Sequence, residues 1–338
     1  MKPVRKPAMP KPVSAEDRLI ARYFRPIARH PGALRLADDA AFLTPPKGWD
    51  VVVTVDAVVG GVHFFPDDPP ATVARKALRV NLSDLAAKGA KPAGFLLTLA
   101  LPKSAGEDWI KAFAFGLGSD SDYFRCPLLG GDSVRTPGPV TISITAFGTL
   151  PKGTMVLRSG AEPGDHILVT GTIGDAALGL ALRQDGDSRW GLDRRQSEYL
   201  AHRYLVPQPR NALAEALRRH ATAAMDVSDG LVGDLGKLCA ASGVCGEVEI
   251  ARVPLSSVAS EAVCQVPRLL ETVLTGGDDY EVVCTIPPHK VASFIVAADN
   301  AGVVVTEIGV VEKGRAGVRF IGRDGKPRTF KQASFSHF

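Results

Sequence analysis

The stretch ARKALRVNLSDLAAKGA (74–90) decides the fold of the first half of the chain. Three leucines recur in it at helical spacing and form one apolar stripe: Leu78, Leu82 and Leu85. Asp84 falls on another side of this predicted helix, together with Asn81 and Lys88. A carboxylate among so many core-forming residues indicates either a functional group or an ion pair between Asp84 and Lys88 on a solvated helix face.

Apolar runs on either side of this helix, VVVTV (51–55) and GFLLTLAL (94–101), predict buried strands. Farther along, the turn-rich segment 151–165 is the best candidate for a domain boundary. We therefore predict two α+β domains, over 14–152 and 153–338, built from mixed sheets with helices packed on one side. This α/β organisation follows from strand and helix signals that alternate along the chain.

Composition indicates an ordinary globular protein of 338 residues. The net charge of +4 comes from a proline-rich basic tail, 1–13, and the rest of the chain has 36 basic and 36 acidic residues. A neutral body gives no argument for nucleic acid as a partner, and no apolar run is long enough for a membrane span. Five cysteines without a CxxC pair favour reduced thiols, hence a cytoplasmic protein, over zinc or disulfides.

Acidic residues recur beside glycines or at the ends of apolar runs. The clusters are Asp38-Asp39, Asp56, GGDS (130–133), DVSDG (226–230) and GGDDYE (276–281). Each alone is explained by a turn, a helix cap or a glycine loop. Together they favour a site in which carboxylates bind Mg²⁺ and the metal binds phosphates.

Other signals are weaker. TGTIGDAALG (170–179) misses the GxGxxG spacing of a dinucleotide fold, and the chain contains no GxxxxGK[ST] phosphate loop. His63, between two apolar residues, is as well explained by packing as by substrate contact.

Read in order, these strings resemble the thiamine-monophosphate kinase family of the aminoimidazole-ribonucleotide synthetase-like superfamily. The matching segments are ADDAAFL (37–43), TVDAVVGGVHF (54–64), KALRVNLSDLAAKGAKP (76–92), GGDS, RSGAEPGDHILVTGTIGDAALGL (158–180), DVSDGLVGDLG (226–236), GGDDYE and FSHF (335–338). The resemblance implies a two-domain subunit whose N-terminal domains pair into a barrel-like dimer core. It also implies transfer of the γ-phosphoryl group of ATP to thiamine monophosphate, giving thiamine diphosphate, with several Mg²⁺ ions.

The resemblance also implies roles for individual residues. Those expected to bind Mg²⁺ are Asp39, Thr54, Val55, Asp56, Asp84, Asp132, Asp226 and Asp229. Those expected to contact ATP are Gly131, Asp132, Arg158 and Ser228, with Arg158 as an electrostatic clamp on the phosphates. Those expected to contact the substrate are His63, Asp278 and Phe335. No general base is expected, because the acceptor phosphate is already ionised at neutral pH.

The chain departs from the family pattern at several positions. Val55 replaces the usual threonine and leaves only a backbone carbonyl for the metal, and Asp278 replaces the usual glutamate. Two alternatives stay open. One is another ATP-dependent reaction of the superfamily, above all a cyclisation of the aminoimidazole-ribonucleotide synthetase type. The other is a non-catalytic protein that binds a nucleotide or a divalent cation. The selenophosphate reaction is disfavoured, because the first cysteine is Cys126.

Overall fold

The computed structural model describes residues 14–185 and 190–335 and divides the chain into two compact units. The first unit comprises Met1–Leu85 and Lys91–Lys152, and the second comprises Ala86–Ala90 and Gly153–Phe338. The predicted basic tail, 1–13, and the last three residues of the FSHF string lie outside the described residues.

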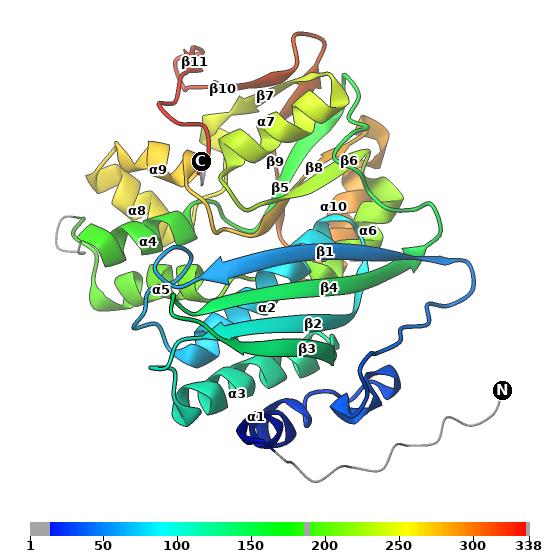
Figure 1. The fold of residues 1–338 in the computed structure, drawn as a ribbon. Coiled ribbons are helices and arrows are strands. Elements are labelled where there is room, and N and C mark those ends of the chain that lie inside the picture. The colour runs from blue at the N-terminus through cyan, green and yellow to red at the C-terminus, as the bar shows by residue number, and fades with distance from the viewer. Residues whose placement is uncertain (1–13, 186–189, 336–338) are drawn as a thin grey trace. The chain divides into compact units, whose positions relative to one another are not determined.

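The first unit is built on a four-stranded sheet with the strand order β1-β4-β2-β3. Its strands are β1 (Trp49–Val59), β2 (Lys91–Leu101), β3 (Leu128–Arg135) and β4 (Thr141–Pro151). Only the β2–β3 pair is parallel. Figure 1 shows helices α2 (Pro70–Ala87) and α3 (Glu107–Tyr123) behind this sheet, on one of its faces. We call this the covered face and the other the open face.

Side-chain alternation explains the two faces. The leucine stripe predicted for 74–90 is fully buried, as expected for a helix that packs on a sheet. On β4, Ile142, Ile144 and Ala146 are buried, whereas the residues between them are partly exposed. On β1, the valines of the open face are 41–60% exposed: Val51, Val53 and Val55.

The N-terminal part of the first unit contains short helices that the sequence did not signal. They are α1 (Ala15–Leu19), η1 (Ile20–Phe24) and η2 (Pro31–Leu36). A capping box starts α1, because the side chains of Ser14 and Asp17 each accept the other's backbone N–H.

The second unit is built on a seven-stranded sheet with the order β11-β10-β7-β9-β5-β8-β6. Its strands are β5 (His166–Thr170), β6 (Ala223–Val227), β7 (Cys245–Glu249), β8 (Glu281–Ile286), β9 (Val305–Glu312), β10 (Gly317–Ile321) and β11 (Pro327–Arg328). Its α-helices are α4 (Asp175–Asp185), α5 (Arg194–Leu205), α6 (Ala214–His220), α7 (Leu231–Ser242), α8 (Ser257–Gln265), α9 (Leu269–Thr275) and α10 (Val291–Asn300). The described part of this unit also contains three single turns: η4 (Asn211–Leu213), η5 (Ile250–Arg252) and η6 (Pro288–Lys290).

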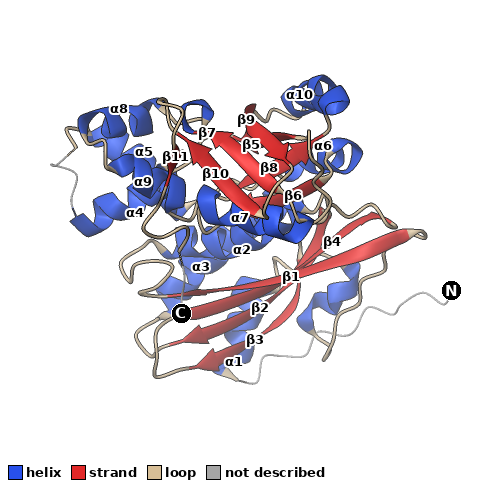
Figure 2. Ribbon diagram, turned by 90° about the horizontal axis from the view of Figure 1, so that it is seen from above, coloured by secondary structure: helices blue, strands red, loops and turns tan. Residues whose placement is uncertain are grey.

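Apolar residues cover both faces of this second sheet. On β5, Ile167 and Val169 point into a cluster that includes α4, α7 and α9, whereas Leu168 joins a cluster with α6 and α10. Figure 2 shows α7 on one side of the sheet and α10 on the other. The strands most central to the unit are therefore buried on both sides.

Two predicted strand ends are wrong. β1 continues to Val59, so Asp56 lies within the strand and does not end it. β3 continues to Arg135, so GGDS lies within a strand and does not mark its end, which was expected at the glycines. Both strands extend through polar residues because their backbones pair with β4 and β2, which local composition does not reveal.

Among the described residues, no helix is both long and apolar enough to cross a membrane.

Candidate functional site

Hydrogen bonds between β1 and α2 bring polar side chains together on the covered face of the first sheet. The Thr54 hydroxyl donates a 2.5 Å hydrogen bond to the Asp84 carboxylate. The backbone N–H of Asp56 donates to the side-chain oxygen of Asn81 at 3.0 Å. Asn81 is fully buried and donates in turn to the backbone carbonyl of Ala77, which fixes its orientation. Thr54, Asp56 and Asp84 therefore form one oxygen-rich group, which we call the β1–α2 group.

Val55 does not contribute its side chain to this group. Neighbouring strand residues point to opposite faces, and the Val55 side chain is 60% exposed on the open face. Its backbone carbonyl is therefore the only atom that fits the predicted role.

His63 lies in the turn after β1. The backbone N–H of Val59 donates to its Nδ1 at 3.1 Å, and its own carbonyl accepts from the Lys76 ammonium at 2.9 Å. Because Nδ1 accepts a hydrogen bond, the ring proton belongs on Nε2. The structure thus gives His63 a fixed orientation at the end of β1.

A cavity of about 750 Å³ borders the open face of the first unit. Asp39, Gly131 and Asp132 line it, together with Thr98, Thr145 and Phe147 from the sheet. Gly131 is required by its close packing, since a Cβ there would lie 2.0 Å from the carbonyl oxygen of Leu97. Glycine thus lets β3 run close to β2 beside the cavity.

The sheet separates Asp132 from the β1–α2 group. Asp132 is in register with Thr98, Thr98 with Ser143, and Ser143 with Ala57. At about 4.8 Å per strand, Asp132 is roughly 14 Å from Ala57. It also points to the face opposite Asp56, because Ala57 and Asp56 alternate. The first unit therefore presents two distinct groups of predicted site residues.

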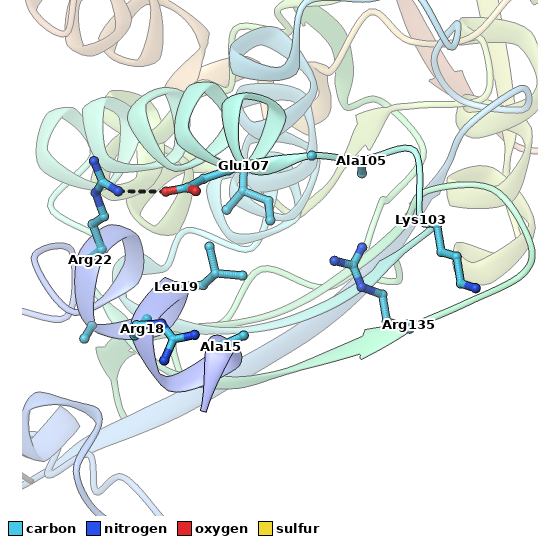
Figure 3. A pocket seen from close by; sticks show the side chains of 11 residues that line it. Ala15, Arg18, Leu19, Arg22, Lys103, Ala105, Glu107 and Arg135 are labelled. Carbon is cyan, nitrogen blue, oxygen red and sulfur yellow. Dashed lines mark hydrogen bonds and ion pairs between the residues drawn. The ribbon is translucent and has the colours of Figure 1, made fainter. Parts of the chain in front are cut away.

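A second cavity of about 670 Å³ lies elsewhere in the first unit (Figure 3). Its lining includes Arg18, Arg22, Lys103 and Arg135, and its carboxylate, Glu107, is bound to Arg22 at 2.7 Å. None of the predicted site residues lines it, so it is not the acid-lined site that the sequence predicts.

In the second unit, the DVSDG loop joins β6 to α7. The backbone N–H groups of Ser228 and Asp229 donate to Asp234 Oδ2, at 3.0 and 2.8 Å. The N-cap of α7 is Gly230, which makes no side-chain cap. The helix-cap explanation for Ser228 or Asp229 is therefore wrong, because the capping carboxylate belongs to Asp234, inside the helix. Neither side chain is therefore used as the cap of α7.

Lys237 is a cation held against this loop. Its ammonium lies 2.6 Å from Asp229 and 2.9 Å from Asp234. Burial acts to lower the pKa of Lys237, but its bonds to the two carboxylates outweigh burial and raise the pKa. Burial also raises the pKa of Asp234, against the opposing effect of Lys237. Neither Asp234 nor Lys237 was among the predicted site residues, although their spacing of three on one predicted helix was visible in the sequence.

The GGDDYE segment lies beside the same loop. The N–H of Asp278 donates to the carbonyl of Ser228 and that of Tyr280 to the carbonyl of Val227, both at 2.8 Å. A Cβ on Gly277 would lie 2.5 Å from the Ser228 oxygen, so this approach needs glycine. The structure therefore brings Asp278, Ser228 and the end of β6 together.

The C-terminal segment returns to this place as well. The backbone N–H of Phe335 donates to the carbonyl of Asp229 at 3.0 Å, and its ring is 49% exposed. Asp226, which is 5% exposed near the end of β6, precedes the same loop. We call the residues gathered around this loop the second-unit group: Asp226, Ser228, Asp229, Asp278 and Phe335.

Arg158 lies apart from that group. Its carbonyl accepts from the Ser242 hydroxyl at 3.2 Å, at the C-terminal end of α7, whereas the DVSDG loop precedes that helix. A helix of 12 residues is roughly 18 Å long. The backbone of Arg158 therefore lies near the opposite end of α7 from Ser228. The predicted contact of Arg158 with ATP phosphates stays a prediction.

The donor atoms of these groups suit a hard cation. They are carboxylate and hydroxyl oxygens, which Mg²⁺ prefers, and the Lys237 ammonium already stands where a cation would neutralise Asp229. Within the described residues, no three His, Cys, Asp or Glu side chains are close enough to hold a metal. The residues therefore fit a metal that binds protein and phosphate oxygens together better than one held by protein alone.

Comparison with family models matches both halves of the chain. Residues 37–150 match the AIR synthase related protein, N-terminal domain, and residues 162–322 match the corresponding C-terminal domain.

Individual relatives are similar over most of their length. Thiamine-monophosphate kinase from Caulobacter vibrioides is 44% identical over 313 residues, which cover 91% of this chain and 87% of the relative. The crystal structure of thiamine-monophosphate kinase from Stenotrophomonas maltophilia aligns with a TM-score of 0.81 and 38% identity, over 92% of this chain and 96% of that one. A structure of AaThiL complexed with AMPPCP and TMP aligns with a TM-score of 0.76 and 30% identity, over 89% and 91%.

Proposed function

Since the chain belongs to the thiamine-monophosphate kinase family of AIR synthase related proteins, we propose that it transfers the γ-phosphoryl group of ATP directly to thiamine monophosphate. The observation that carries this proposal is the near-full-length similarity to kinases of that name. A similar structure holds AMPPCP and TMP together, a nucleotide and the acceptor that the reaction requires.

The main obstacle in this reaction is electrostatic, because donor and acceptor are both polyanions. Bound Mg²⁺ would supply neutralising charge to the phosphates and stabilise the charge of the transferring group. The residues proposed to hold it are the carboxylates of Asp39, Asp56, Asp84, Asp132, Asp226 and Asp229, with the Thr54 side chain and the Val55 carbonyl. The β1–α2 group, the acidic residues beside the open-face cavity and the second-unit group would each contribute ligands to this set.

The chain's own hydrogen bonds orient these oxygens before a ligand binds. Thr54 holds one oxygen of Asp84 and leaves the other to a cation. Asp234 fixes the backbone of Ser228 and Asp229, which directs the loop without using their side chains. Preorganised charge of this kind lowers the reorganisation required in the transition state.

Substrate contacts are proposed for both units. Gly131 and Asp132 beside the cavity, together with Ser228 and Arg158, would contact ATP. His63, Asp278 and Phe335 would contact thiamine monophosphate, with the exposed Phe335 ring available to stack on the thiamine rings. Since no side chain has to remove a proton from the acceptor phosphate, in-line transfer needs no general base.

We further propose a homodimer that pairs the open faces of two first units. On β1 that face exposes Val51, Val53 and Val55 by 41–60% of their surface, and these valines form one apolar row along the edge strand. A second copy would cover them. We place the protein in the cytoplasm, in accord with its free cysteines.

The test is to incubate the purified protein with ATP, Mg²⁺ and thiamine monophosphate and to measure thiamine diphosphate by chromatography. Omission of Mg²⁺ and replacement of ATP by AMPPCP are the controls. A protein that binds ATP but forms no diphosphate would support the cyclisation or the non-catalytic alternative instead.

A further inference from the structure

Two residues flanking a buried carboxylate adopt a backbone conformation that L-amino acids rarely adopt. Asp278 has φ +75° and Tyr280 has φ +52°, and neither is glycine. Such residues are strained and persist only where their surroundings hold them in place. The structure shows what holds these two, because the residues that alternate with them, Asp279 and Glu281, are almost wholly buried: 1% and 0% exposed.

Glu281 is anchored by three side chains from distant parts of the second unit. It accepts from the Thr170 hydroxyl at 2.6 Å, from Arg203 at 3.0 Å, and from both Nε and Nη2 of Arg210 at 2.6 and 2.5 Å. Burying charged groups is unfavourable, and apolar residues of equal volume often stabilise a fold at least as much as a buried ion pair does. A buried acid with two arginines is therefore a costly way to secure a strand end.

Asp279 is anchored on the other side of the segment. It accepts from the backbone N–H groups of Gly174, at 2.7 Å, and Ala176, at 3.4 Å, at the start of α4. The segment is thus held at alternate residues by side chains that point inward. The backbone N–H of Tyr280, between these anchors, and that of Asp278, just before them, bond to carbonyls of the DVSDG loop.

We infer that Glu281 and Asp279 are positioning residues for the phosphoryl transfer: through Thr170, Arg210 and the start of α4 they hold Asp278 in its left-handed conformation beside Ser228. This inference rests on the proposed function, in which Asp278 contacts the acceptor. The anchors sit next to the loop that they serve, because Glu281 is in register with Val227 at the end of β6. Disturbing them should shift Asp278 and weaken binding of the acceptor more than binding of ATP.

The first experiment measures steady-state kinetics of Glu281→Gln in the full chain. We expect KM for thiamine monophosphate to rise about tenfold and KM for ATP to change less than about twofold. The matched control is Asp165→Asn, which also neutralises a buried carboxylate of the second unit. Asp165 is 4% exposed, bonds to Thr222 at 2.6 Å and precedes β5, at the end opposite Thr170. The control should leave both KM values unchanged.

A second pair of variants decides the matter if Glu281→Gln does not fold. Thr170→Val keeps the buried volume but removes the hydroxyl that donates to Glu281 and accepts from the Val282 N–H, whereas Thr170→Ser keeps the hydroxyl and removes a buried methyl group. We expect Thr170→Val to raise the acceptor KM about fivefold and Thr170→Ser to restore it. If only packing at Thr170 matters, Thr170→Ser should raise the acceptor KM more than Thr170→Val does.

Equal changes in both KM values, or a lowered Tm with unchanged kinetics, would overturn the positioning role while leaving the proposed function intact. Absence of turnover in the wild type would overturn the proposed function itself, and this inference with it.

Discussion

Replacing Asp84 by asparagine separates the hydrogen bond of this residue from its charge. Asparagine keeps a side-chain oxygen at the position of Asp84 Oδ2, which now accepts the 2.5 Å bond from Thr54. Only the charge-assisted part of that bond is lost, about 1 kcal/mol. In a unit of about 150 residues this corresponds to a decrease in Tm of roughly 2–4 °C.

The same substitution should nearly abolish turnover. The proposed role of Asp84 is to help hold cations that neutralise several phosphate charges, an effect worth several kcal/mol in the transition state. A loss of about 4 kcal/mol corresponds to roughly a thousandfold decrease in kcat.

The assay pairs diphosphate formation with thermal unfolding, each with and without Mg²⁺. Asp68→Asn is the control, because Asp68 is a buried carboxylate of the same unit that accepts from the Phe65 N–H at 2.9 Å. Mg²⁺ should raise the Tm of the wild type and the control more than that of Asp84→Asn. A large fall in Tm with most of the activity kept would refute the reasoning and make Asp84 a structural residue.

Three other predictions concern single residues. His63→Ala should raise KM for thiamine monophosphate while KM for ATP stays constant, and an unchanged acceptor KM in steady-state assays would remove His63 from the site. Gly131→Ala should lower Tm and raise KM for ATP, because its Cβ would meet the Leu97 carbonyl at 2.0 Å; wild-type melting would contradict this packing. Native protein at pH 8 should react with a thiol reagent at Cys264 alone, since Cys264 is exposed and burial raises the pKa of Cys126 to about 12; mass spectrometry would reveal rapid labelling of Cys126 as the contrary result.

Sequence patterns within a single helix or strand predicted the type of that element and its buried face. The leucine stripe of α2 gives the helical period and the buried face directly. Strand ends were less accessible, because Asp56 and GGDS lie inside strands that are held by pairing with distant segments. A short polar segment with glycines predicts a turn, and only its pairing with a distant strand shows that it belongs to a sheet.

The sequence suggests candidate site residues one by one, but it does not give their arrangement in space. Nothing local indicates that Asp132 and Asp56 lie on opposite faces of one sheet, since this depends on register across three other residues. The anchoring of Glu281 was equally hidden. Its partners Thr170 and Arg210 are 111 and 71 positions away along the chain.

In the proposed reaction, the γ-phosphoryl group passes directly from ATP to thiamine monophosphate. The most direct measurement uses ATP labelled at the γ-phosphate and follows the label through a single turnover. We predict that the label appears in thiamine diphosphate and not in inorganic phosphate. Label released as inorganic phosphate, with thiamine monophosphate unchanged, would contradict the account.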